Sequence, residues 1–261
     1  MDNSIRQFLD RYCVGPENAD LKLLAMIAGA FSFLPYENVT KILKHARCVD
    51  SDSQLRRTKE VLEDHLRWNT GGTCFSLCNA LLEVLTQNGF EAFIAMGDMH
   101  YGANIHCAVI VKLLGRLYLL DPGYLLHQPI PLPQNGEEVR LHTSMNTVIV
   151  KWEENGIVSL YTEESGCRKW RYRLRVFPTD AAEFEKHWIR SFSLNSMETI
   201  LLSRINEHGR IYFRKDRLEN VSPAARKKAI VSPDDAMALS HVFGLPADLI
   251  ASAQHFLLGR K

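Results

Sequence analysis

The sequence predicts an α+β protein built from three successive parts. Apolar residues recur at intervals of three and four over most of residues 1–89, which is the period of an amphipathic helix. Short segments that are apolar or alternate with polar residues follow in residues 90–177, as in antiparallel strands. Residues 178–261 mix both patterns. We therefore expect a helical domain, an antiparallel β domain and a C-terminal α/β domain with these boundaries.

Four segments of the first part have helical periodicity. The fourth begins at Cys74 and ends near Gly89, since glycine commonly terminates helices. A further helix is expected near residues 179–190. At the end of the chain, Ser232 is expected to cap a helix whose first position is Pro233. The first three segments are IRQFLDRYC (5–13), LKLLAMIAGAF (21–31) and LRRTKEVLEDHL (55–66).

Six segments of the second part are predicted strands, and Gly, Asn or Pro separates most of them. Asn155-Gly156 lies between two of them and predicts a hairpin turn. In the third part, strands are expected near residues 197–204 and 208–214. The six segments are FEAFIAMGD (90–98), NIHCAVIVKL (104–113), RLYLLD (116–121), NTVIVKWE (146–153), IVSLYTE (157–163) and RKWRYRLRVF (168–177).

Composition is that of an ordinary globular protein, with 46% hydrophobic and 23% charged residues. The net charge of +1 gives no reason to expect a nucleic-acid or membrane partner. No apolar run approaches the roughly 18 residues of a membrane span, and the N-terminal segment MDNSIRQFLDRYC is typical of an amphipathic helix rather than a signal peptide. Six cysteines in a chain of 261 residues do not indicate a disulfide framework, so we expect a cytoplasmic protein.

Cys74 stands where a turn gives way to an apolar helix, in the segment NTGGTCFSLCNALL (69–82). The free N–H groups and partial positive charge at a helix N-terminus favour an anion, so a cysteine there tends towards thiolate. The alternative is a small residue at a helix start that has no chemical role. A nucleophilic cysteine also needs a base, and the base needs a group that orients it.

His106 and Asp121 form a candidate base and orienting group, because they lie on two consecutive predicted strands. They are separated by an odd number of positions in the sequence, so a hairpin with an even number of loop residues places both side chains on the same face of the sheet. A turn at Leu113-Leu114 would set them directly opposite each other. A turn at Leu114-Gly115 would make them diagonal neighbours, about 7–8 Å apart at the Cα atoms. The alternative is an ordinary turn after Asp121 and a core histidine at 106.

Five segments, in this order, resemble the arylamine N-acetyltransferase family and together extend over most of the chain. The resemblance implies that Cys74 is the acyl-accepting nucleophile, His106 its base and Asp121 the orienting group. It also implies a helical domain, an antiparallel β-barrel domain and a C-terminal α/β lid, with a cysteine-protease-like Cys-His-Asp arrangement. The segments are FLPYENVTKIL (33–43), GGTCF (71–75), HCAVIV with RLYLLDPGY (106–111 and 116–124), FEKHWIRSFSLNS (184–196) and IVSPDDAMALSHVFGL (230–245).

The activity implied by this resemblance is a ping-pong transfer of an acetyl group. Acetyl-CoA would be the acyl donor, a Cys thioester the intermediate, and an aromatic amine or hydrazine the acceptor, with no metal. In the family the loop after the catalytic Asp approaches CoA. By resemblance, Gly123, Tyr124 and Leu125 are therefore expected to bind the donor.

Three positions depart from the family pattern. Thr70 stands where the family usually has an arginine before the two glycines, and Cys78 where it has an asparagine. Leu125 replaces a glycine that keeps the donor loop open. A leucine there would add bulk near the CoA pantetheine and favour longer acyl chains, unless its side chain points to solvent.

The same residues are compatible with three other functions. One is an amide synthase, N-acyltransferase or thioesterase that takes a longer acyl chain from CoA or from an acyl carrier protein. Another is a zinc site formed by Cys74, Cys78 and either His106 or Cys107. A third is a binding scaffold that has lost catalysis. A basic strand face could meet an acidic carrier or a CoA phosphate, or could simply be solvated; it comprises Arg171, Arg173 and Arg175.

Overall fold

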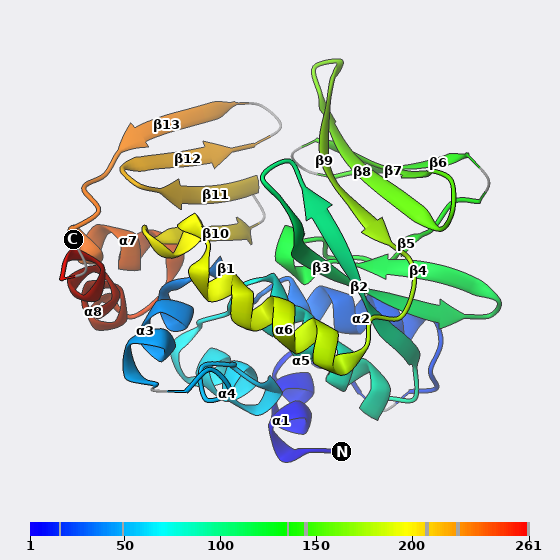
Figure 1. Cartoon of the computed structure of the whole chain (residues 1–261), viewed down its shortest axis with the longest axis horizontal. Coiled ribbons are helices and arrows are strands. Elements are labelled where there is room, and N and C mark those ends of the chain that lie inside the picture. The colour runs from blue at the N-terminus through cyan, green and yellow to red at the C-terminus, as the bar shows by residue number, and fades with distance from the viewer. Residues whose placement is uncertain are drawn as a thin grey trace.

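In the computed structural model, a helical N-terminal part packs beneath a β-barrel and a smaller C-terminal sheet that lie side by side (Figure 1). The barrel is an antiparallel sheet of eight strands that nearly closes, and the C-terminal sheet has five strands. The α+β prediction, with its helical, barrel and α/β parts, is therefore confirmed. The structure describes residues 1–15, 17–48, 50–134, 136–143, 146–206, 209–222 and 225–259.

The helical part contains the four predicted helices and one that the sequence did not reveal. Asp2 and Asp20 cap the first two, each accepting a hydrogen bond from a backbone N–H of the first turn. The unpredicted helix is short and begins with two β-branched residues, Val39 and Thr40, which favour strands. The helices are α1 (Asn3–Arg11), α2 (Leu21–Phe31), α3 (Val39–Arg47), α4 (Thr58–Trp68) and α5 (Cys74–Gln87).

The barrel strands follow the order β5-β4-β3-β2-β9-β8-β7-β6, and every pairing is antiparallel. All six predicted strands are present, and Asn155-Gly156 lies in the turn between β7 and β8 with positive φ at both residues. The strands are β2 (Glu91–Met99), β3 (Gly102–Leu113), β4 (Arg116–Leu120), β5 (Ile130–Pro131), β6 (Glu138–His142), β7 (Thr147–Trp152), β8 (Ile157–Glu164) and β9 (Cys167–Arg175).

The C-terminal sheet takes one strand from the helical part, because β1 (Tyr36–Glu37) pairs with β10. Three short 3₁₀ turns, at Pro122–Tyr124, Ser191–Ser193 and Asn195–Met197, lie outside the two sheets. The remaining elements are α6 (Ala181–Arg190), β10 (Leu201–Asn206), β11 (Gly209–Arg214), β12 (Arg217–Val221), β13 (Arg226–Ile230), α7 (Ala236–Phe243) and α8 (Ala247–Leu258).

Two details of the C-terminal prediction were wrong. Helix α7 begins at Ala236, and the side chain of Asp235 caps it by accepting a hydrogen bond from Ala238 N. Ser232 instead accepts at its carbonyl from Asp235 N in the preceding turn. The strand expected from residue 197 begins at Leu201, after the 3₁₀ turn.

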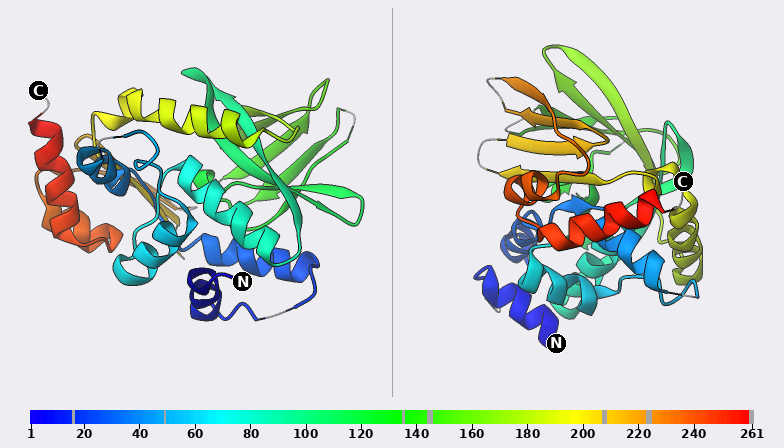
Figure 2. Two further views of the ribbon diagram at one scale, coloured as in Figure 1. Left: turned by 60° about the horizontal axis from the view of Figure 1, so that its bottom comes forward. Right: turned by 90° about the vertical axis from the view of Figure 1, so that its left-hand side faces the viewer.

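Helix α5 lies at the centre of the molecule, against the barrel strands β2 and β3 (Figure 2). Its side chains belong to a core that also joins α1–α4 to the C-terminal helices, whereas a second apolar cluster fills the barrel. The residue at the start of α5 is thereby held by packing from all three parts. No helix among the described residues is long and apolar enough to cross a membrane.

Candidate active site

Cys74 is the first residue of α5, and its side chain is almost completely buried. The preceding glycines are required by close packing. A Cβ at Gly71 would lie 1.9 Å from the carbonyl oxygen of Pro35, and one at Gly72 would lie 2.2 Å from Ser76 Oγ. Thr73, at the N-cap position, makes no side-chain capping hydrogen bond. The positive end of the helix is therefore not screened by Thr73 and lies directly beside the sulfur.

His106 and Asp121 are in direct contact. His106 Nε2 lies 2.7 Å from Asp121 Oδ2, and both side chains are buried. In the β3–β4 hairpin, Leu113 pairs with Arg116, which places Leu114 and Gly115 in the turn with positive φ. Of the two turns expected from the sequence, the structure has the one at Leu114-Gly115, so His106 and Asp121 are diagonal neighbours on the two strands.

Asp121 holds the imidazole in one orientation. Its Oδ1 accepts a hydrogen bond of 2.9 Å from Tyr124 N, which fixes the carboxylate while Oδ2 accepts from His106 Nε2. The proton on Nε2 leaves Nδ1 as the ring nitrogen free to accept a proton. The imidazole also lies close enough to Cys74 to lower the pKa of its thiol. The three residues predicted from the sequence thus form one connected chain.

The charges of this site favour a thiolate and an imidazolium. The pKa of Cys74 lies well below its usual range: a hydrogen bond with the Cys107 thiol is the largest cause, and His106 and the ammonium of Lys41 also lower it, against burial. Burial opposes a charged His106, but the charge and hydrogen bond of Asp121 outweigh it, so the pKa of His106 is raised well above its usual range. Cys74 is therefore suited to act as a nucleophile.

The other two cysteines near the site are buried behind Cys74. Cys78 Sγ donates to the carbonyl oxygen of Cys107 at 3.3 Å, and burial raises the pKa of both thiols. Among the described residues, no group of three or more His, Cys, Asp and Glu side chains could hold a metal ion.

Arg56, which was not predicted as a site residue, contacts the loop that precedes Cys74 (residues 69–73). Its buried guanidinium donates to the carbonyl oxygen of Gly71 at 2.7 Å, to Thr40 Oγ1 at 2.6 Å and to Asp64 Oδ2 at 2.7 Å. Arg56 thus supplies a positive charge beneath this loop. The loop itself has Thr70 at the position where the arylamine N-acetyltransferase family usually has an arginine. Nothing in the local sequence distinguishes Arg56 from Arg57 beside it.

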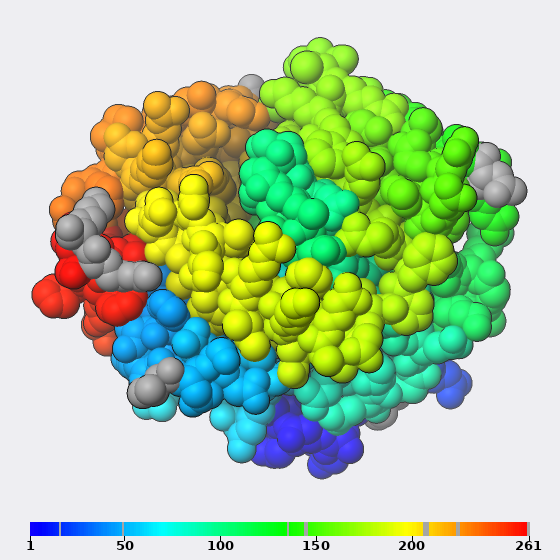
Figure 3. Space-filling model, viewed as in Figure 1, coloured from blue at the N-terminus to red at the C-terminus, as the bar shows by residue number. Residues whose placement is uncertain are grey.

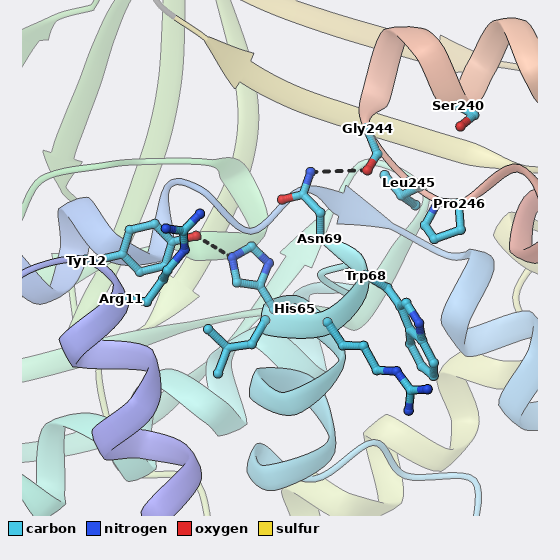
Figure 4. A pocket seen from close by; sticks show the side chains of 11 residues that line it. Arg11, Tyr12, His65, Trp68, Asn69, Ser240, Gly244, Leu245 and Pro246 are labelled. Atoms are coloured by element: carbon cyan, nitrogen blue, oxygen red, sulfur yellow. Dashed lines mark hydrogen bonds between the residues drawn. The ribbon is translucent and has the colours of Figure 1, made fainter.

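A second unpredicted support is His65 (Figure 4). Its Nδ1 lies 2.8 Å from the carbonyl oxygen of Thr70, which only accepts, so Nδ1 carries the proton and Tyr12 OH donates to Nε2 at 2.5 Å. Burial is the main cause that lowers the pKa of His65 to about 4. Tyr12 and His65 border a cavity of about 600 Å³. None of the residues that line this cavity also lines the cleft in front of Cys74 that is described next.

A cleft of about 590 Å³ opens in front of Cys74. Figure 3 shows the surface hollowed where the β2–β3 hairpin meets the C-terminal sheet, and lining residues come from both. Most of the lining is aromatic, aliphatic or uncharged polar. The lining residues are Tyr36, Lys41, Thr73, Cys74, Phe75, His100, Tyr101, Ile105, Ser191, Leu194, Asn195, Ser196, Leu201, Tyr212 and Arg214.

The turn after β4 contains the three residues expected to bind the donor, Gly123, Tyr124 and Leu125. Only Gly123 lies close to Cys74. A Cβ at Gly123 would lie 2.6 Å from Cys74 Cβ. Tyr124 packs edge-on against Tyr172, with ring centroids 5.8 Å apart. Leu125 has a φ of 59° and is 4% exposed, so its side chain does not point to solvent. It lines a small separate cavity beside Tyr124 rather than the cleft at Cys74.

Comparisons with known proteins agree with this fold. A family model described as N-acetyltransferase matches residues 20–250. An arylamine N-acetyltransferase from Mycobacterium abscessus has a TM-score of 0.80 and 16% identity, covering 97% of this chain and 94% of that one. A comparison with curated proteins finds no match.

Two further solved structures illustrate the range of the fold. The Mycobacterium marinum arylamine N-acetyltransferase, solved in complex with CoA, has a TM-score of 0.76 and 15% identity, covering 95% of this chain and 97% of that one. An enzyme from Bacillus cereus, described as having a Cys-His-Glu catalytic triad, has a TM-score of 0.72 and 18% identity, covering 94% and 99%.

The chain is therefore an acyltransferase of the N-acetyltransferase class. It belongs to the arylamine N-acetyltransferase family. The family and the enzyme class expected from the sequence are both confirmed.

Proposed function

We propose that this enzyme transfers an acetyl group from acetyl-CoA to an aromatic amine or hydrazine through a thioester on Cys74. The observation that carries the proposal is a buried thiol at a helix N-terminus, connected to the His106–Asp121 pair and open to a cleft. Each of these features lowers the cost of forming and using a thiolate.

His106 takes the proton of Cys74 before the first half-reaction, which gives a thiolate and an imidazolium, and the thiolate then attacks the carbonyl carbon of the acetyl thioester. Asp121 holds the imidazolium in position and stabilises its charge. The negative oxygen that forms lies near the backbone N–H of Cys74 at the start of α5, which is suited to donate to it. Collapse of this intermediate expels CoA as the thiol, which takes its proton from His106.

In the second half-reaction, the amine attacks the acetyl carbon on Cys74, and the bond to sulfur breaks. His106 accepts the proton lost by the amine, and the Cys74 thiolate is released. The aromatic side chains of Tyr36 and Tyr101 give the cleft surfaces on which a flat arylamine can stack. The aromatic and aliphatic part of the lining also disfavours water beside Cys74, so aminolysis is favoured over hydrolysis.

For the donor, we propose that CoA approaches along the turn formed by Gly123, Tyr124 and Leu125. The relative from M. marinum was solved with CoA, which supports a CoA site in this fold. Gly123 would contribute by its lack of a side chain, since this allows the turn to touch Cys74. Leu125 would shape the donor site from the far side of the turn.

Steady-state kinetics test this function. CoA release from acetyl-CoA should require an arylamine, and varying both substrates should give the parallel double-reciprocal lines of a ping-pong reaction. Cys74→Ala should abolish release. Intersecting lines would indicate direct transfer without an acyl-enzyme. Rapid CoA release without amine would indicate a thioesterase, and a higher kcat/KM with octanoyl-CoA than with acetyl-CoA would indicate a longer physiological acyl chain.

A further inference from the structure

The second cavity, beside Tyr12 and His65, has no role in the proposed acetyl transfer. It lies where the C-terminal ends of α1 and α4 meet the turn between α7 and α8. Figure 4 shows Arg11 and Tyr12 on one side of it and Asn69 on the other, with His65 between them. Its volume of about 600 Å³ is within the range of sites that bind small molecules.

The polar side chains of this cavity are mainly cations and hydrogen-bond donors. Arg11 and Arg67 line it, and the described lining residues include no aspartate or glutamate. Neither guanidinium forms an ion pair within the part of the chain that the structure describes; that of Arg67 lies 4.7 Å from the ring centroid of Trp68. The amide of Asn69 and the hydroxyl of Ser240 provide further N–H and O–H groups.

A third cation lies next to the cavity. Arg204, on β10, donates to the carbonyl oxygen of Phe243 at 3.0 Å, beside the lining residue Gly244. Burial is the main cause of the low pKa of His65, and the charges of Arg204 and Arg11 lower this pKa further. The positive charge around the cavity therefore reaches its buried wall, and no described lining residue balances it. Such a cavity favours an anion.

We propose that this cavity binds the phosphate group of a small phosphorylated molecule, held by Arg11 and Arg67. A phosphate monoester carries a charge of about −1.5 to −2 at neutral pH and three acceptor oxygens, so it can use more than one arginine. A carboxylate brings one charge and two oxygens. Guanidinium groups bind phosphate through paired N–H groups. Trp68 and Pro246 provide apolar surface for the organic part of the ligand.

This site is separate from the catalytic cleft, since the two share no lining residue. A ligand in the cavity therefore leaves Cys74 accessible. It contacts the loop 69–73 at Asn69, next to Thr70, whose carbonyl oxygen accepts a hydrogen bond of 2.8 Å from His65 Nδ1. The inference does not depend on the proposed function: Cys74→Ala, which should transfer no acetyl group, should bind the ligand as tightly as the wild type.

The first test is isothermal titration calorimetry with phenyl phosphate as the probe. The wild type should bind one equivalent, and Arg11→Met or Arg67→Met should raise the Kd by about 10- to 100-fold, as expected for loss of a charge-assisted hydrogen bond. The matched control is Arg6→Met, because Arg6 is exposed on the same helix as Arg11 and does not line the cavity. Its Kd should equal that of the wild type. Absence of saturable binding by the wild type, or the same Kd in all four proteins, would overturn the proposal.

A second pair of variants keeps every arginine and changes the charge of the cavity from another element. Ser240→Asp places a carboxylate in the lining from α7, and Ser240→Asn places a neutral group of nearly the same shape there. The aspartate should raise the Kd of phenyl phosphate by at least 10-fold relative to the asparagine, because it repels the phosphate. Equal Kd values in these two variants would place the ligand elsewhere and contradict the assignment.

Two further probes distinguish the possible ligands. Phenyl phosphate should bind more tightly than inorganic phosphate and more tightly than benzoate. Equal affinity for inorganic phosphate would mean that the site takes the free ion, and equal affinity for benzoate would mean that it takes any anion; either result overturns the assignment to a phosphorylated molecule. Phenyl phosphate should also leave the alkylation of Cys74 by iodoacetamide unblocked. Protection of Cys74 that persists in Arg11→Met would place the phosphate in the catalytic cleft and refute a separate site.

Discussion

Gly123→Ala isolates the contact between the turn after β4 and the nucleophile. The added Cβ would lie 2.6 Å from Cys74 Cβ, 3.0 Å from Cys74 Cα and 3.3 Å from Asp121 Oδ1. Non-bonded carbon atoms pack at about 3.5–4.0 Å, so the overlap with Cys74 is roughly 1 Å. A rotamer change cannot relieve it, because both atoms of Cys74 are fixed by the start of α5. The turn or the nucleophile must therefore move.

We expect this displacement to lower kcat/KM for acetyl transfer by about 100-fold, the usual cost of misplacing a reacting group by about 1 Å. Gly29→Ala is the matched control: Gly29 lies inside α2, a Cβ there would meet no atom within 4 Å, and alanine should be neutral or slightly stabilising. Circular dichroism and thermal unfolding of both variants would show whether Gly123→Ala remains folded. If the folded variant kept kcat/KM within about threefold of wild type, close packing of Gly123 against Cys74 would not be needed for activity.

Three further substitutions test the residues that hold His106 and the loop before Cys74 in place. Asp121→Asn should lower kcat by about 10⁴-fold, because the amide no longer fixes His106 in the required tautomer; wild-type turnover would remove Asp121 from the mechanism. Arg56→Lys keeps a positive charge but loses the guanidinium fork that contacts Gly71, Thr40 and Asp64 at the same time, so alkylation of Cys74 and acetyl transfer should slow together by about 10-fold; unchanged rates with unchanged stability would make Arg56 irrelevant to the loop. His65 is neutral in the folded protein, with a pKa of about 4 against about 6.5 when unfolded, so its contribution to stability is present above pH 6.5 and is lost as the pH falls towards 4. Over this range His65 should lower the free energy of unfolding by about 3 kcal/mol, so denaturant titrations should give a shallower fall in His65→Gln than in the wild type.

The parts of the fold that the sequence revealed are those with strong apolar periodicity. The barrel strands and the helices around α5 bury many side chains, so their patterns are clear. Strand β13 was missed for the opposite reason: every residue from Arg226 to Ile230 is exposed, and an edge strand of this kind carries no apolar alternation. The start of α7 was misplaced because Ser232 and Asp235 both have capping side chains, and the sequence does not show which one caps.

The residues of the candidate site also differ in whether the sequence alone could reveal them. His106 and Asp121 belong to one hairpin, so local strand geometry was enough to bring them together. Arg56 and Lys41 carry no local signal. The contact of Lys41 with Ser191 joins residues 150 positions apart and exists only after the C-terminal part has packed on α3. Polar groups recruited by such long-range packing cannot be identified from one sequence.

Formation of the acyl-enzyme is the most direct test of the proposed chemistry. The protein is mixed with acetyl-CoA in the absence of amine, and its intact mass is measured before and after addition of an arylamine. We expect a gain of one acetyl group, about 42 Da, located on the peptide that contains Cys74 and removed when the amine is added. Cys74→Ala should gain no mass. An unmodified wild-type protein, or an acetyl group on another residue that the amine does not remove, would contradict a mechanism through Cys74.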